Sequence, residues 1–125
     1  MRDSLEFNVD LHNFSGSLDT LLDLAKSQKV DLEKISITKL ADQFHVFIKS
    51  TKNINLELAS EYLLMATWLT YLKSKLLLPE SEEEEFKALE IAEKLKLQLK
   101  KLELIRLLSD QMLKKKRLGR DVFFR

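Results

Sequence analysis

The sequence predicts a mostly α-helical fold, a helical bundle of three to five helices with one short N-terminal β-strand. Glycine and proline together number three in 125 residues, which is too few for the many turns of an all-β sandwich or barrel. Apolar residues make up 45% of the chain, and over most of its length they recur with the 3.6-residue period of helices. A charged fraction of 33% is enough to cover such a core with a polar surface.

The first predicted element is a strand over residues 5–11. Apolar residues alternate here with polar ones, the period-2 pattern of a half-buried strand: Leu5, Phe7, Val9 and Leu11. Because a single strand cannot satisfy its own backbone hydrogen bonds, it needs a partner. The candidates are residues 122–124, a second copy of the chain or another protein, and the sequence does not choose among them.

Two amphipathic helices are expected next. The turn at residues 14–17 opens the first of them, with Gly16 or Ser17 near the N-cap, and an apolar face continues it to about Lys29. The second begins after the N-cap candidate Ser36 and ends near residues 50–53. Its apolar residues have offsets of 0, 3, 4, 7, 10 and 11: Ile37, Leu40, Ala41, Phe44, Phe47 and Ile48.

The third helix, predicted over residues 56–78 and ended by Pro79, has more apolar residues than one buried stripe needs. One face has coiled-coil-like spacing, and we assign it to the protein's own core: Leu58, Tyr62, Met65, Leu69, Leu72 and Leu76. A second face is a stripe of small residues around Leu63: Ala59, Ser60, Ala66, Thr67, Thr70 and Ser74. A third side groups three large residues: Leu64, Trp68 and Tyr71. A small domain rarely covers three such faces by itself, so this helix predicts a protein partner.

A long fourth helix is predicted from residue 82 to about residue 117. Ser81 and Glu84 have the spacing of a capping box, and the run Glu82–Glu85 suits the positive end of the helix dipole. The basic residues 114–117 suit the opposite end. The apolar pattern changes phase near residues 97–101, which indicates a break in the helix, and Gly119 is the residue expected just past its end.

Few residues suggest chemistry. The absence of cysteine excludes disulfides, thiolate catalysis and cysteine-based zinc sites, and two glycines cannot build a phosphate-binding loop. We interpret Glu82–Glu85 as a solvated helix start rather than a metal site. His12 and His45 have no nucleophile or orienting acid at a useful spacing. We therefore expect a protein that is not an enzyme and has no catalytic residues, cofactor or metal.

Charge is segregated along the chain, with −6 over residues 80–93 and +8 over residues 94–125. The basic stretch supports one alternative, a nucleic-acid-binding module formed by residues 94–125. A second alternative is a helical scaffold that forms a homodimer through residues 5–11 and its spare apolar faces. The chain has no apolar run of 18 residues and begins with acidic residues, so we expect no membrane span, no signal peptide and a cytoplasmic location.

Three stretches match a known family in wording and order: Phe14-x-Gly16-x-Leu18-Asp19-x-Leu21-Leu22-x-Leu24, then residues 58–67 (LASEYLLMAT) and residues 71–79 (YLKSKLLLP). They resemble the N-terminal half of the segregation and condensation protein A (ScpA) family, the kleisin subunits of the bacterial SMC–ScpA–ScpB condensin complex. The family has Pro where this chain has Ser17, which should slightly weaken the helix start. Its members are longer and end in a winged helix, so the chain resembles an N-terminal portion or a short relative.

The resemblance implies a non-enzymatic kleisin role in chromosome condensation and segregation. Residues 1–79 would form the helical domain that binds the neck coiled coil of SMC, next to its ATPase head. Residues 80–125 would form a long helical extension leading to the central region that binds the ScpB dimer. DNA would be held only indirectly, by the complete ring, at the nucleoid.

The face that meets the SMC neck is our inference from the residues and is not implied by the family. Our first choice is the small-residue stripe with Leu63, and our second is the side with Leu64. The expected interface residues are Ala59, Ser60, Leu63, Leu64, Ala66, Thr67, Trp68, Thr70, Tyr71 and Ser74. A tryptophan at such a position is more often a core residue than an interface hot spot, but it is kept because tryptophan is enriched in hot spots.

Overall fold

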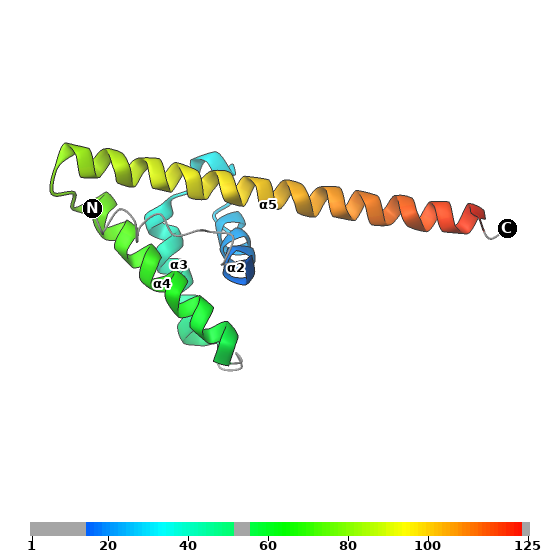
Figure 1. Ribbon diagram of the computed structural model, residues 1–125, viewed down its shortest axis with the longest axis horizontal. Helices are drawn as coiled ribbons and strands as arrows, with labels where there is room; N and C mark the ends of the chain where they lie inside the picture. The colour runs from blue at the N-terminus through cyan, green and yellow to red at the C-terminus, as the bar shows by residue number, and fades with distance from the viewer. Residues whose placement is uncertain (1–14, 52–55, 124–125) are drawn as a thin grey trace.

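The structure, a computed structural model, describes residues 15–51 and 56–123 and, within them, the side chains of residues 16–51 and 59–115. This part of the chain contains four α-helices and one short 3-10 helix (Figure 1): α2 (Ser15–Lys26), η2 (Leu32–Lys34), α3 (Ile37–Ser50), α4 (Leu56–Leu77) and α5 (Glu82–Phe123). The prediction of a mostly helical fold is confirmed there.

The predicted strand at residues 5–11 lies outside the described residues. One of its candidate partners, however, can be assessed. Val122 and Phe123 belong to α5, so the backbone at that end of the chain is helical. This counts against residues 122 and 123 as the strand's partner, one of the three candidates that the sequence left open.

Side-chain hydrogen bonds hold the connection between α2 and α3, and one of them caps α3. The helix α2 stops at Lys26, slightly earlier than predicted, and Lys29 adopts a left-handed backbone with φ of 58°. The side chain of Gln28 then accepts from the Ser36 amide at 2.9 Å and donates to the Ser36 carbonyl at 3.2 Å. Ser36 is the N-cap of α3, as predicted, and its hydroxyl accepts from the Lys39 amide at 3.2 Å.

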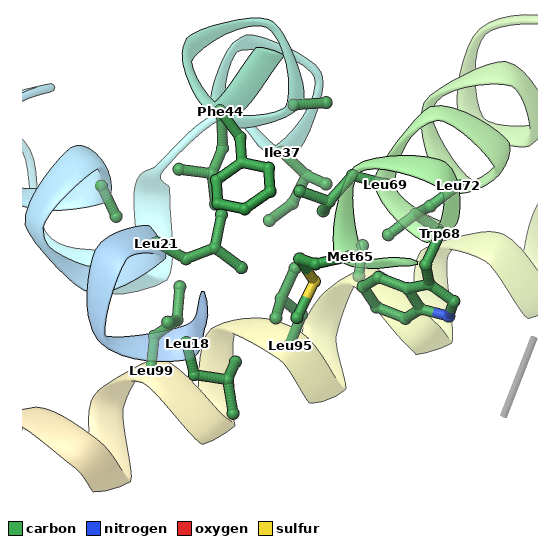
Figure 2. Packing of buried hydrophobic residues seen from close by; sticks show 14 of the residues in the cluster. Leu18, Leu21, Ile37, Phe44, Met65, Trp68, Leu69, Leu72, Leu95 and Leu99 are labelled. Atoms are coloured by element: carbon green, nitrogen blue, oxygen red, sulfur yellow. The ribbon is translucent and has the colours of Figure 1, made fainter. Parts of the chain in front are cut away.

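All four helices contribute to one hydrophobic core, in which α3 and α4 pack most extensively on each other. Phe44 of α3 is fully buried, and the centroid of its ring lies 5.7 Å from the ring centroid of Tyr62 on α4. Figure 2 shows Leu21 of α2, Met65 of α4 and Leu95 of α5 meeting between the helices. The core thus extends well past Pro79 in sequence. The predicted boundary at residue 79 separates an SMC-binding part from a helical extension. It divides the chain by expected function and stays a proposal.

The turn between α4 and α5 forms only half of the predicted capping box. The Ser81 hydroxyl accepts from the Glu84 amide at 3.1 Å, as a capping box requires. The Glu84 carboxylate, however, turns toward α4 and forms an ion pair with Lys75 at 2.6 Å, which raises the pKa of Lys75. This ion pair joins the end of α4 to the start of α5.

The helix α5 is continuous from Glu82 to Phe123, so the predicted break near residues 97–101 is wrong. The change of apolar phase reflects two sides of one helix: Leu95 and Leu99 are fully buried, whereas Leu97 is 53% exposed on the opposite side. Gly119 lies inside α5 and does not end it. Figure 1 shows the first half of α5 lying across the bundle and the second half projecting beyond it.

Candidate protein-binding surface on helix α4

The inner side of α4 is the core face that the sequence predicted. Tyr62, Met65, Leu69 and Leu72 are all buried, with between 0% and 8% of their surface exposed. Leu76 is partly buried against the same cluster, and the side chain of Leu58 is not among those described. The coiled-coil-like spacing was therefore a correct guide to which side of α4 faces the domain's own helices.

The outer side of α4 exposes two large leucines among small residues. Leu63 is 57% exposed and Leu64 is 61% exposed. They share one side of the helix with four exposed residues and one half-buried tyrosine at helical spacing. We call this set the α4 outer face: Ser60, Leu63, Leu64, Thr67, Thr70, Tyr71 and Ser74. The two predicted sides, around Leu63 and around Leu64, are thus one continuous surface.

Two residues expected at the interface belong to the core instead. Ala66 is 7% exposed and Trp68 is 8% exposed, and Figure 2 shows the Trp68 ring between α4 and α5. Ala59 is half-buried at the edge of the outer face. The sequence alone did not indicate which helix covers Trp68. The docked part of α5 covers it, and that contact joins segments far apart in sequence.

The threonines make the α4 outer face less polar than its sequence suggests. The Thr67 hydroxyl donates to the Leu63 carbonyl at 2.9 Å, and the Thr70 hydroxyl donates to the Ala66 carbonyl at 2.8 Å. Each hydroxyl is satisfied within its own helix, so its methyl group is available to a partner. The result is a shallow apolar surface on which another helix can approach closely.

A residue that sequence reasoning missed orients α4 against α2. The Glu61 carboxylate accepts from the Gly16 amide at 3.0 Å and from the Ser17 amide at 3.2 Å, so it caps the N-terminus of α2. Ser17, where the family has Pro, supplies one of these amides, and a proline could not. Thr20 and Tyr62 add a hydroxyl contact at 2.7 Å. The sequence offered a weak signal, because Glu61 is one of only two acidic residues in α4, with Glu57 one turn before it.

Ion pairs hold α5 onto the bundle as far along the helix as Arg106. Arg106 contacts Asp19 at 2.9 Å and Asp23 at 3.0 Å, and the two carboxylates raise its pKa. Lys100 pairs with Glu33 of η2 and lowers the pKa of that carboxyl group. Residues 94–125 were the basis for the alternative of a nucleic-acid-binding module. Several of their basic side chains are already paired with carboxylates, so less positive charge is left to attract phosphates.

The described part of the chain contains no group of three or more histidine and acidic side chains placed to hold a metal ion. Within the same residues, no helix combines the length and the apolar composition that a membrane span requires. The described features define a helical domain with an exposed apolar face on α4.

Comparison with known proteins assigns this domain to a family. The family model for "Segregation and condensation protein ScpA" matches residues 24–120, and the chain belongs to the ScpA family. This is a family of kleisin-type structural subunits associated with condensin and is not an enzyme family. The resemblance seen in the sequence is therefore confirmed.

Curated relatives named Segregation and condensation protein A agree with the family match. The relative from Mycoplasma mobile is 45% identical over 84 residues, which are 66% of this chain and 34% of the relative. Those from Bacillus pumilus and Halothermothrix orenii are each 39% identical, over 66% and 72% of this chain and 32% and 38% of the relative. The chain thus spans about a third of the length of these relatives. No solved structure matches the chain significantly.

Proposed function

We propose that the chain acts as the N-terminal part of a kleisin in a bacterial SMC–ScpA–ScpB condensin complex, where it binds the neck coiled coil of SMC through the α4 outer face. One observation supports this most directly. Leu63 and Leu64 stay more than half exposed although the opposite side of the same helix is fully packed. An exposed apolar helix face next to a well-formed core is typical of a binding surface.

The dimensions of the α4 outer face suit a coiled coil. From Ser60 to Ser74 it extends over four turns, or roughly 21 Å at 1.5 Å per residue. Small residues on both sides of the leucines let a partner helix approach along the ridge. Two helices of a coiled coil would complete a bundle with α4. Burying the exposed part of both leucines, about 60% of each, would supply about 2 to 4 kcal/mol of favourable free energy.

The role of α5 in this proposal is mechanical. Its first half is fixed to the domain by Leu95 and Leu99, and the Arg106 ion pairs hold the helix just where the second half begins. The rest of the second half continues as a single helix. Over residues 104–123 that half is about 30 Å long. It would lead the chain away from the SMC-binding domain and toward the ScpB dimer, without any chemistry. DNA would be held by the assembled ring in the cytoplasm, at the nucleoid.

The test is the variant Leu63→Glu, mixed with an SMC head that carries its neck coiled coil. Because Leu63 is exposed, the charge is tolerated in the free chain, whereas in the complex it would be buried without a partner. We expect complex formation, followed by light scattering, to weaken by at least about 100-fold. The matched control is Val46→Glu, since Val46 is 67% exposed on α3, away from α4.

Two results would contradict the proposal. One is equal binding by wild type and Leu63→Glu, which would place the contact elsewhere. The other is no binding by the wild-type chain at any concentration. Helical circular dichroism of each variant checks that the fold is kept, and a loss of helix in Leu63→Glu alone would show that this side of α4 is needed for folding.

A further inference from the structure

The ion pair between Lys75 and Glu84 lies at the border between α4 and α5 and is better shielded than the others. The Lys75 ammonium is 2.6 Å from the Glu84 carboxylate, and the two side chains are 19% and 26% exposed. Each of the other ion pairs among the described side chains has at least one partner that is more than half exposed. Because opposite charges attract more strongly where water is partly excluded, this pair should hold its geometry best.

The same ammonium group also contacts an aromatic ring. It lies over the ring of Tyr71, 5.3 Å from the ring centroid. Tyr71 comes four residues before Lys75, so the two side chains are neighbours on one side of α4. A cation at this distance is attracted to the face of the ring. The Lys75 side chain therefore links a carboxylate of α5 to a tyrosine of α4.

Tyr71 is the large aromatic residue of the α4 outer face. It is half-buried, and it packs against the hydrophobic core. It follows the exposed Leu64 by seven residues, which places both on the same side of the helix. Tyrosine is enriched among interface hot spots, since its ring offers a large contact area with few rotatable bonds. The orientation of this ring thus matters to any helix that packs along the α4 outer face.

We propose that Lys75, held by Glu84 of α5, is a positioning residue that fixes the Tyr71 ring in the orientation in which a partner helix meets it. This inference rests on the proposed function, because it requires that the α4 outer face binds a partner. A side chain that is already ordered in the free protein loses little freedom on binding, and the complex is tighter for that reason. The first turn of α5 would then support a binding surface that belongs to α4.

The first test uses the free 125-residue chain and needs no partner. NMR scalar couplings report the χ1 rotamers of Tyr71. We expect one dominant rotamer in the wild-type chain and a mixture of rotamers in Lys75→Ala and in Glu84→Gln. Lys75→Arg keeps a cation beside both contacts and should keep the dominant rotamer. A Tyr71 ring that is equally ordered in Lys75→Ala overturns the proposal.

The second test measures the affinity of the full chain for an SMC head that carries its neck coiled coil. Lys75→Ala should weaken binding by about 2-fold to 12-fold, the cost of ordering one side chain on binding, and Lys75→Arg should bind like the wild type. The matched control is Lys73→Ala, because Lys73 forms an ion pair of the same length on the same helix, but with Asp42 of α3. Circular dichroism checks that each variant is folded. Equal losses in Lys73→Ala and Lys75→Ala would overturn the proposal.

A double-mutant cycle separates positioning from direct contact. Tyr71→Ala removes the ring and should weaken binding by roughly 30-fold or more, as at other hot spots. Without the ring, Lys75 has nothing to position, so adding Lys75→Ala to Tyr71→Ala should cause no further loss. Losses that simply add would show that Lys75 acts independently of Tyr71, and this result would overturn the proposal.

The outcomes also separate this inference from the proposed function. If Leu63→Glu weakens binding but Lys75→Ala binds like the wild type, the proposed function stands and the role of Lys75 is refuted. If the wild-type chain does not bind the SMC neck at all, the proposed function fails, and the role of Lys75 at that interface fails with it.

Discussion

The two halves of α5 differ sharply in how far their apolar side chains are buried. Ala88, Leu95 and Leu99 in the first half are fully buried, whereas the large apolar residues from Leu104 to Leu113 are all more than half exposed. Both halves have a similar content of apolar residues, and both are helical. The difference shows that one helix can be packed into a core at one end and leave its large apolar side chains exposed at the other.

The largest expected contrast between the halves is in stability. Leu95→Ala removes a fully buried side chain that lies between α2 and α4, so it should lower the free energy of unfolding by about 2 to 5 kcal/mol. Leu108→Ala, on the projecting half, should change it by less than about 0.5 kcal/mol. Urea denaturation followed by circular dichroism measures both. Similar losses in the two variants would mean that the projecting half is packed in solution.

A smaller effect is expected where the two halves meet. Arg106→Gln removes both ion pairs to α2, which are partly exposed, so the free energy of unfolding should fall by about 1 kcal/mol or less. Because salt screens exposed charges, the difference from wild type should shrink as salt is raised from 0.01 M to about 1 M. Asp110→Asn, farther along α5, is the matched control. An effect of Arg106→Gln that does not depend on salt would contradict an ionic contact.

The smallest expected effect is the pH dependence of stability that comes from the ion pair between Glu33 and Lys100. Lys100 lowers the pKa of Glu33, so this ion pair stabilises the folded chain above the ordinary pKa of a glutamate. The contribution is lost as pH falls through the lowered pKa in the folded state. NMR titration of the Glu33 carboxyl carbon should show a pKa below that of an isolated glutamate. In Lys100→Gln the pKa should rise toward the ordinary value, and no rise would contradict the contact.

Local patterns predicted a large part of the structure. The offsets after Ser36 predicted α3 and its N-cap, and the spacing of Met65, Leu69 and Leu72 predicted the buried side of α4. These predictions succeeded because capping and helical periodicity depend on residues within a few turns of each other. The same local reasoning failed at residues 97–101. The change in apolar pattern there was interpreted as a break in the helix, whereas it reflects one buried and one exposed side of a continuous helix.

The sequence by itself determined that this protein is helical, where most of its helices begin and end, and which family it belongs to. Tertiary structure decided that α5 lies across the bundle, that Trp68 and Ala66 become core residues and that Leu63 and Leu64 remain on one exposed face. It also decided that Glu61 caps α2. The physical reason is that burial depends on contacts between residues far apart in the chain, and no local pattern of side chains specifies which distant helix will cover them.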